Sequence, residues 1–202
     1  MPMISSRGRK ALAAVAVLGG VLLAQQASAA CRISSSWFTA QDVTMDMGQI
    51  VILPSTPVGG VIKEISESIT QRDRVASCDW NGGRSIGEYV NAAQKRPVPG
   101  FANTYETDVP GVGIKLFRDS GAIQVYYPHQ LSFGGGSTVT LIGGRFRIQL
   151  IKTAAQTGSG VIAPNGRFTT YYFDGDSASR PVLTSTFKGS GTTVVSPTCE
   201  VQ

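Results

Sequence analysis

Apolar positions along this chain come in short runs, many of which alternate with polar residues. In the clearest run, residues 145–152, apolar residues at even positions alternate with Arg145, Arg147 and Gln149. Gly, Pro, Asn and Ser interrupt the runs, and no helical period of 3.6 residues persists. The pattern predicts about ten β-strands and no helix, arranged as an all-β sandwich or barrel.

Turn residues place the boundaries of the expected strands; Pro164-Asn165-Gly166, for example, is typical of a hairpin turn. Residues 61–69 fit either a short amphipathic helix or an edge strand, and we favour the strand. The expected strands cover residues 43–53, 61–69, 72–78, 101–106, 113–118, 122–127, 145–152, 161–162, 168–173, 182–188 and 192–195. In the first of them, Met45, Met47, Ile50 and Ile52 are expected to point inward.

Residues 1–30 have the three parts of a secretory signal peptide. Arg7, Arg9 and Lys10 form a positive n-region, residues 11–24 an apolar run, and residues 27–29 (or 28–30) a cleavage site. The alternative is an uncleaved membrane anchor, but the run is shorter than the ~20 residues that a spanning helix needs. A lipidated Cys31 is disfavoured because Leu is usual three residues earlier and Ser stands there. We therefore expect an exported protein without membrane insertion after cleavage.

Charge and length change once the leader is removed. Three of the 18 basic residues and none of the 13 acidic ones leave with it, so the net charge falls from +5 to +2. This excess is too small to support nucleic-acid binding. A hydrophobic content of 42% excludes a disordered chain. We expect one domain over residues 31–195, followed by a linker and the truncated start of a second domain at 196–202.

Three cysteines in an exported chain predict one disulfide and one remaining thiol. We expect the bond between Cys31 and Cys78, because Cys199 lies beyond the proline-marked linker and would normally pair within the following domain. In the chain-entropy model, closing this loop of 48 residues stabilises the fold by roughly 4 kcal/mol.

Several segments together resemble the two-domain tip adhesins of chaperone–usher pili in Gram-negative bacteria. A cysteine opens the mature chain, and Cys78 follows a β segment and opens a short polar-aromatic loop. Residues 105–114 resemble the T-x-V-P-G-I-G segment of minor fimbrial adhesins, and residues 191–201 resemble a linker and the opening of a pilin domain. The receptor-binding domain of the type 3 fimbrial adhesin is the expected match, and the mannose-binding type 1 adhesin is a more distant one.

This resemblance implies an elongated β-sandwich of jelly-roll or immunoglobulin-like type that binds a host glycan or an extracellular-matrix protein at its far tip. It also implies export through the periplasm to the fimbrial tip, with a periplasmic chaperone, an outer-membrane usher and an adjacent pilin as partners. The pilin domain would be completed by a strand from the next subunit. Because Cys31 follows the leader almost directly, we expect no free donor strand and hence a terminal position in the fibre.

The first candidate ligand site is the loop of Asp79, Trp80 and Asn81, directly after Cys78. A sugar is bound by an aromatic face together with Asp or Asn side chains, and this loop offers both. In the mannose-binding adhesin, polar residues after the matching cysteine line the pocket, although that polar pair is not preserved here. The alternative is an ordinary β-turn in which Trp80 covers the edge of the core.

A second candidate cluster surrounds the predicted hairpin near the C-terminal half. Its members are Asn165, Tyr171, Tyr172, Asp174 and Asp176. The resemblance would bring this hairpin to the same tip, whereas the alternative is tyrosines on a half-exposed strand followed by a polar turn. Residues 174–176 only faintly resemble a calcium loop, so we expect no metal and no cofactor.

Catalytic chemistry has little support in the sequence. The single histidine, His129, would have to serve any Ser-His-Asp site, and an exposed loop position is the favoured interpretation. Arg145 and Arg147 could contact an acidic ligand, but a solvated sheet face is the simpler interpretation; Trp37 and Phe38 are expected to pack in the core or between domains. The alternatives to an adhesin are a minor structural pilus-tip subunit without a host ligand and a secreted carbohydrate-active enzyme.

Overall fold

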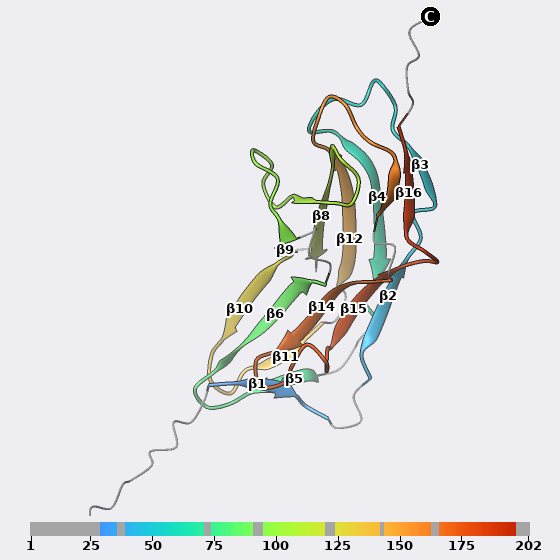
Figure 1. Ribbon diagram of the computed structural model, residues 1–202. Coiled ribbons are helices and arrows are strands. Elements are labelled where there is room, and N and C mark those ends of the chain that lie inside the picture. Colours follow the sequence, from blue (N-terminus) through green and yellow to red (C-terminus); the bar gives the residue numbers. More distant parts are fainter. Residues whose placement is uncertain are drawn as a thin grey trace, which may run out of the picture.

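The computed structural model describes residues 29–35, 39–70, 74–90, 95–119, 124–141, 144–162 and 166–196. Sixteen strands and no α-helix occur in these residues (Figure 1). No helix in this part of the chain is long and apolar enough to cross a bilayer. Some of the predictions concern residues outside the described part of the chain. These are residues 1–28, Trp37, Phe38, Asn165 and Cys199.

Two main sheets pack face to face and enclose the core, which confirms the predicted β-sandwich. One has the strand order β10-β6-β14-β15-β2, and the other has the order β4-β12-β8-β7, with β9 pairing with β8. The strands of the first are β10 (His129–Phe133), β6 (Gly83–Tyr89), β14 (Arg167–Phe173), β15 (Leu183–Phe187) and β2 (Gln41–Met45). Those of the second are β4 (Val61–Ser68), β12 (Arg145–Lys152), β8 (Val112–Asp119), β7 (Tyr105–Glu106) and β9 (Gln124–Tyr126).

The core is built from the inward positions of both sheets. On β12, Phe146, Ile148 and Leu150 are fully buried, as the alternation of this strand predicts. They belong to one apolar cluster with residues of the opposite sheet such as Phe168 and Phe187, whose rings lie 4.9 Å apart edge to face. The edge strand β4 of the second sheet confirms the strand interpretation of residues 61–69.

Two small sheets close the opposite ends of the sandwich (Figure 1). At one end β1 (Cys31–Ile33), β5 (Arg74–Cys78) and β11 (Thr138–Thr140) pair in the order β1-β5-β11. At the other end β13 (Gly160–Ile162), β16 (Thr192–Val195) and β3 (Gln49–Val51) pair in the order β13-β16-β3. The chain leaves the domain after β16. The small sheet of β1, β5 and β11 lies far from this exit, and we call its end of the domain the β1 end.

The predicted disulfide is present between Cys31 and Cys78. The two residues are direct partners in the antiparallel pairing of β1 with β5. Both are buried, so the bond joins the first strand of the domain to the strand that leads into the Trp80 loop. It thereby holds the β1 end together across a large sequence separation.

The first predicted strand is divided in two. Met45, Met47, Ile50 and Ile52 are all buried, as expected. However, burial changes from odd to even positions at Gly48, which lies between β2 and β3 and has a φ of 60°, so β3 starts with the other parity. The two halves then pair in parallel with different strands, β2 with β15 and β3 with β16.

Other differences from the prediction concern strands that carry few large apolar residues. On β6 the inward positions are Gly83, Ser85, Gly87 and Tyr89, so the strand shows no apolar alternation and was not predicted. Strands β1, β10 and β11 were missed as well. The expected strand 101–106 is confirmed only for Tyr105–Glu106, because residues 98–104 form a tight loop closed by hydrogen bonds between Val98 and Thr104 and between Thr104 and Phe101.

Candidate functional site

A mostly apolar pocket of about 210 Å³ opens between strands of both sheets and β11. Residues from β8, β9, β10, β11 and β14 contribute to its wall together with two loops. The lining residues are Ile69, Arg118, Asp119, Val125, Leu131, Phe133, Val139, Thr140, Leu141, Gly144 and Tyr171. The volume suits one side chain or one sugar-sized group, and apolar walls with a few polar groups are typical of small-ligand sites.

Arg118 is the charged group that distinguishes this pocket. It follows Ile114 and Leu116 at the inward positions of β8, so the alternation of the strand directs its side chain into the domain. Only 9% of it is exposed, and its guanidinium carbon lies 4.1 Å from the centre of the Tyr171 ring. This is a cation–π contact in a largely desolvated setting.

Arg118 has no carboxylate within ion-pairing distance among the residues that the structure describes. The adjacent carboxylate, Asp119, lies 2.7 Å from the Nε of Arg147 on the outer face. The Nε of Arg118 is buried without a hydrogen-bond partner in the described part of the chain. An unpaired donor on a buried cation is uncommon in a folded domain, and here its side chain forms part of a pocket wall.

His129 contributes the second polar group beside Arg118. Its Nδ1 lies 3.1 Å from the carbonyl of Tyr126, which only accepts, so Nδ1 carries the proton. Nε2 is then the acceptor for Nη2 of Arg118, 3.4 Å away. Burial of the ring, and secondly the charge of Arg118, lower the pKa of His129 from 6.5 to about 4.

The predicted loop position of His129 is therefore wrong. The residue begins β10, and its ring lies over Gly87 of the neighbouring strand, where an added Cβ would lie 2.3 Å from the ring carbon Cε1. The ring also packs edge to face on Tyr127 at 4.8 Å. Both ring nitrogens contact groups of the domain, and Nε2 lies beside the guanidinium of Arg118.

The loop predicted from Cys78 onward is a tight turn with an exposed aromatic ring. Asp79 and Gly82 form a bridge around Trp80 and Asn81, and the N–H of Gly82 donates to the carbonyl of Asp79 at 2.8 Å. Trp80 is 91% exposed. The interpretation in which Trp80 covers the edge of the core is thus wrong, and the ring is available for contact from outside.

Three neighbours hold this turn in place. The N–H of Asp79 donates to the carbonyl of Ala30 at 2.8 Å, and the N–H of Gly136 donates to the carbonyl of Asp79 at 3.1 Å. Gly135 packs against the backbone of Trp80 so closely that an added Cβ would lie 1.8 Å from the carbonyl oxygen. With the disulfide at Cys78, these contacts make the turn a fixed platform for the exposed ring.

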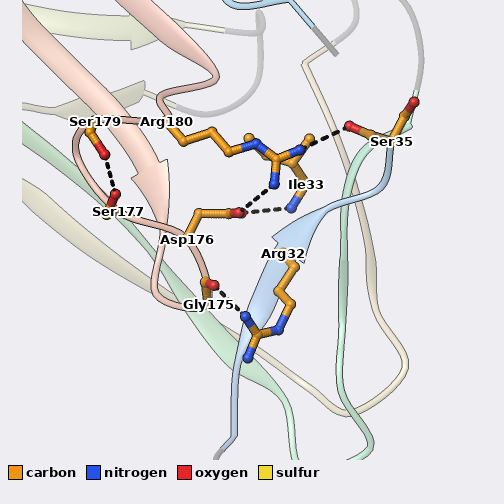
Figure 2. Close-up of polar contacts among 8 residues, drawn as sticks. All are labelled: Arg32, Ile33, Ser35, Gly175, Asp176, Ser177, Ser179 and Arg180. Atoms are coloured by element: carbon orange, nitrogen blue, oxygen red, sulfur yellow. Dashed lines mark hydrogen bonds and ion pairs between the residues drawn. The ribbon is translucent and has the colours of Figure 1, made fainter. Parts of the chain in front are cut away.

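Asp174 and Asp176 serve the fold of the β1 end. Asp174 accepts hydrogen bonds from the backbone N–H of Cys31 at 2.7 Å and of Arg84 at 2.9 Å. Asp176 accepts from the N–H of Ile33 at 2.7 Å and pairs with Arg180 at 3.2 Å (Figure 2). Figure 2 also shows Arg32 donating to the carbonyl of Gly175. The carboxylates of Asp174 and Asp176 therefore connect β1 to the turn after β14.

The described members of the second predicted cluster have different surroundings. Tyr171 is 1% exposed and forms part of the pocket wall under Arg118, whereas the adjacent Tyr172 is half-buried on the other face of β14, where burial and Glu88 raise its pKa. Asn165 lies outside the described residues. Tyr171 thus lines the pocket, whereas Asp174 and Asp176 accept hydrogen bonds from the backbone of β1.

Arg147 faces outward from β12, as predicted. It forms ion pairs with Glu64 at 3.1 Å and with Asp119 at 2.7 Å. Gln149 donates to the other oxygen of Glu64 at 2.7 Å. These partners occupy the guanidinium, which supports the interpretation of a solvated sheet face for this residue.

Sequence reasoning missed Arg118 as a site residue. One signal was present: residues 114, 116 and 118 share one face of the strand predicted for 113–118, and the third is an arginine. A cation at a predicted inward position indicates either a buried ion pair or a binding wall. The contribution of His129, by contrast, depends on β10, a five-residue strand that was not among the expected strands.

Comparisons with known proteins agree with this architecture. The family model of the MrkD-like receptor binding domain matches residues 43–190. A curated fimbria adhesin protein of Klebsiella pneumoniae is 32% identical over 174 residues, which are 86% of this chain and 50% of that protein. The chain thus spans about half the length of this relative.

A solved structure gives a match over the whole of its chain. The receptor binding domain of the plasmid-born adhesin MrkD1P of Klebsiella pneumoniae superposes with a TM-score of 0.68 at 30% identity. The match covers 87% of this chain and 100% of that chain.

Proposed function

Because the chain belongs to the family of MrkD-like receptor binding domains, we propose that it is the receptor-binding domain of a fimbrial tip adhesin. It acts by noncovalent binding of a host glycan or an extracellular-matrix protein. The single observation that carries this proposal is the Arg118 pocket: a concave apolar site with a buried cation that lacks a carboxylate among the described residues.

The chemistry of the pocket defines the kind of group that enters it. The guanidinium stacked on Tyr171 offers donors to a carboxylate or a carbonyl oxygen, and Leu131, Val139 and Leu141 offer apolar contact beside it. A group with an oxygen acceptor next to an apolar face fits both features. Such groups occur on acidic sugars and on extended peptide segments. A binding array that holds both glycans and matrix proteins distinguishes these two sources.

The exposed ring of Trp80 is proposed as a second contact for the same receptor. A flat aromatic ring with 91% exposure stacks on the face of a sugar or of a proline ring. Residues 134–137 join β10 and β11, whose residues Phe133 and Val139 line the pocket, and Gly135 in this loop backs the Trp80 turn. One rigid loop therefore connects the two proposed contacts.

The position of these features suits a domain at the tip of a fibre. The Trp80 turn belongs to the β1 end, and the chain leaves the domain at the opposite end, after β16 (Figure 1). Export to the fimbrial tip, and assembly by a periplasmic chaperone, an outer-membrane usher and an adjacent pilin, complete the proposal. These partners would act on the pilin domain that is predicted to begin within residues 196–202.

Catalysis is not proposed for this domain. The single histidine of the chain uses Nδ1 and Nε2 for contacts within the domain, and its pKa of about 4 makes it a poor base at neutral pH. Asp174 and Asp176 each accept backbone hydrogen bonds. A carbohydrate-active enzyme would need such groups directed into a cleft.

The proposal is tested with a combined array of glycans and extracellular-matrix proteins, probed with the purified, oxidised domain. A saturable signal that Arg118→Met and Trp80→Ala weaken, while circular dichroism stays unchanged, supports receptor binding and names the ligand class. A blank array from a folded domain favours the minor structural pilus-tip subunit. Hydrolysis of any oligosaccharide on the array would contradict the assignment to a binding domain.

A further inference from the structure

A second hollow, of about 300 Å³, lies where β6 ends and β10 begins, and we call it the β6–β10 hollow. It is lined by Ile86, Gly87, Glu88, Pro128, His129 and Gln130. None of these residues lines the Arg118 pocket. In Figure 1 this part of β6 and β10 is remote from the β1 end, and hence from the Trp80 turn.

Alternation along the strands places three of the lining side chains on the outer face of the first sheet. On β6 the buried positions are odd-numbered, so Ile86 and Glu88 point outward, and both are half-buried. Gln130 is exposed and lies directly opposite Ile86 in the pairing of β10 with β6. The β6–β10 hollow therefore opens on the side of the sheet that is turned away from the second sheet.

Tyr172 extends this surface onto the neighbouring strand, β14. It is the partner of Ile86 in the pairing of β14 with β6, and its side chain is half-buried. Burial, and secondly the charge of Glu88, raise the pKa of Tyr172, so its hydroxyl lies within electrostatic range of that carboxylate. Ile86 is thus flanked by the amide of Gln130 on one side and by an aromatic ring on the other.

The carboxylate of Glu88 makes no ion pair with the residues that the structure describes. Its partner in the pairing with β14 is Thr170, which is only 3% exposed. The Oγ1 of Thr170 has no hydrogen-bond partner within the described part of the chain, so it does not bind the carboxylate either. The oxygens of Glu88 are left to accept hydrogen bonds from water or from a ligand.

These groups together fit the ring of a sugar. The C–H face of a sugar packs on aromatic and apolar side chains, which Tyr172, Ile86 and Pro128 supply. The hydroxyls of a sugar both donate and accept hydrogen bonds; Glu88 accepts, and the amide of Gln130 does both. A volume of about 300 Å³ is at the lower end for ligand sites, which suits one ring rather than a long chain.

The charge of the β6–β10 hollow favours a neutral sugar over an acidic one. Glu88 is the one carboxylate in its lining, which contains no lysine or arginine. His129 is uncharged at neutral pH, because its pKa is about 4. An acidic sugar would bring a second negative charge next to Glu88 with no cation to offset the repulsion. The Arg118 pocket has the opposite preference, since a guanidinium donates to oxygen acceptors.

We propose that the β6–β10 hollow is a second binding site of this domain and that it binds the ring of a neutral sugar. Glu88 and Gln130 bind the hydroxyls of the sugar, and Tyr172 and Ile86 pack against its C–H face. The site goes beyond the proposed function and does not depend on the Arg118 pocket. A second site on another face raises the avidity of the domain for a surface that displays many glycans.

Titrations followed by amide NMR spectra of the isotope-labelled, oxidised protein test the proposal. The probes are the methyl glycosides of glucose, galactose, mannose and N-acetylglucosamine, with the methyl glycoside of glucuronic acid as the acidic counterpart. For at least one neutral glycoside we expect saturable shifts that centre on the amides of Ile86, Glu88, Gln130 and Tyr172. The acidic glycoside should give no saturable shift of these amides.

Two variants with the same substitution identify the group that binds the sugar. Glu88→Gln keeps the size of the side chain and removes its charge, so the neutral glycoside should bind roughly tenfold more weakly. Glu67→Gln is the matched control, because it changes an exposed glutamate on β4 of the other sheet and should bind as the wild type does. Amide spectra that are unchanged away from the substitution show that both variants are folded.

The absence of saturable shifts with all four neutral glycosides would overturn the proposal, and so would equal affinity of Glu88→Gln and the wild type. Shifts of the same amides with N-acetyl-lysine amide, and none with the sugars, would also overturn it, because the hollow would then bind a basic side chain. Glycoside binding without any signal on the receptor array would count against the proposed function and not against this site.

Discussion

The carboxylate of Asp174 accepts the backbone N–H of Cys31 at 2.7 Å, across 143 positions of the sequence. The same carboxylate accepts the N–H of Arg84, and Asp176 accepts the N–H of Ile33. Strand β1 is short, so these side-chain acceptors replace part of the pairing that a longer strand would make with its neighbours. The disulfide and the two aspartates together define the β1 end.

Replacing Asp174 by Asn should destabilise the domain without disturbing its pocket. The amide offers one acceptor oxygen where the carboxylate offers two, and its NH₂ group would face a backbone donor. We expect a loss of about 1–3 kcal/mol in the free energy of unfolding, measured by urea denaturation of the oxidised protein. Asp46→Asn removes an exposed pair with Lys188 and should change stability little; an equal loss in both variants would contradict this account.

Replacing Gly135 by Ala should disturb the Trp80 turn. The added Cβ would meet the Trp80 carbonyl oxygen at 1.8 Å, so the turn or the loop between β10 and β11 has to move. We expect lower thermal stability and an altered Trp80 fluorescence. Gly134→Ala is the matched control, because its Cβ would meet only the Ser137 hydroxyl at 3.8 Å. The same melting temperature in both variants would show that the loop does not support the turn.

His129 gives the domain a defined acid sensitivity. Its pKa is about 4 in the folded chain and 6.5 ordinarily, so between these values the unfolded chain binds a proton that the folded chain does not. Titration of His129 therefore lowers the free energy of unfolding as the pH falls from about 6.5 to about 4. Below pH 4 it has no further effect on this free energy.

The titration of His129 is directly measurable, because the chain has one histidine. The imidazole resonance in NMR spectra should titrate with a midpoint near pH 4. In His129→Gln the dependence of stability on pH between 6.5 and 4 should be weaker. A midpoint at the ordinary value would mean that the ring is solvated and does not contact Arg118 as described.

The sequence predicted the fold where large apolar residues alternate, as on β12, and it predicted the disulfide from the position of the third cysteine. It failed on β6, because Gly83 and Gly87 occupy inward positions that must be small: an added Cβ at Gly83 would meet the backbone of Cys31, and one at Gly87 would meet His129. Such positions are determined by neighbours distant in sequence, which no local pattern shows.

The candidate site was predicted in part for a similar reason. Trp80 was expected on a loop pinned by the disulfide, and the turn and its exposed ring agree with that expectation. The hypothesis that Asp174 and Asp176 bind ligand rested on residue type and on the position that the resemblance implies for their hairpin. Their backbone partners on β1 could not be known from the sequence. Arg118 is recognised as a site residue only from the fold, in which β8, β10 and β14 come together around its guanidinium.

The dissociation constants of the wild type, Arg118→Met and Arg167→Met for the strongest ligand of the array test the central claim most directly. Arg118→Met keeps the length of the side chain and removes the buried donor, and Arg167→Met removes an exposed arginine at the start of β14. A charge-assisted hydrogen bond of about 1.5–3 kcal/mol predicts that Arg118→Met binds roughly 10- to 100-fold more weakly, with Arg167→Met close to the wild type. Equal affinity of all three folded proteins would contradict the assignment of the receptor site to the Arg118 pocket.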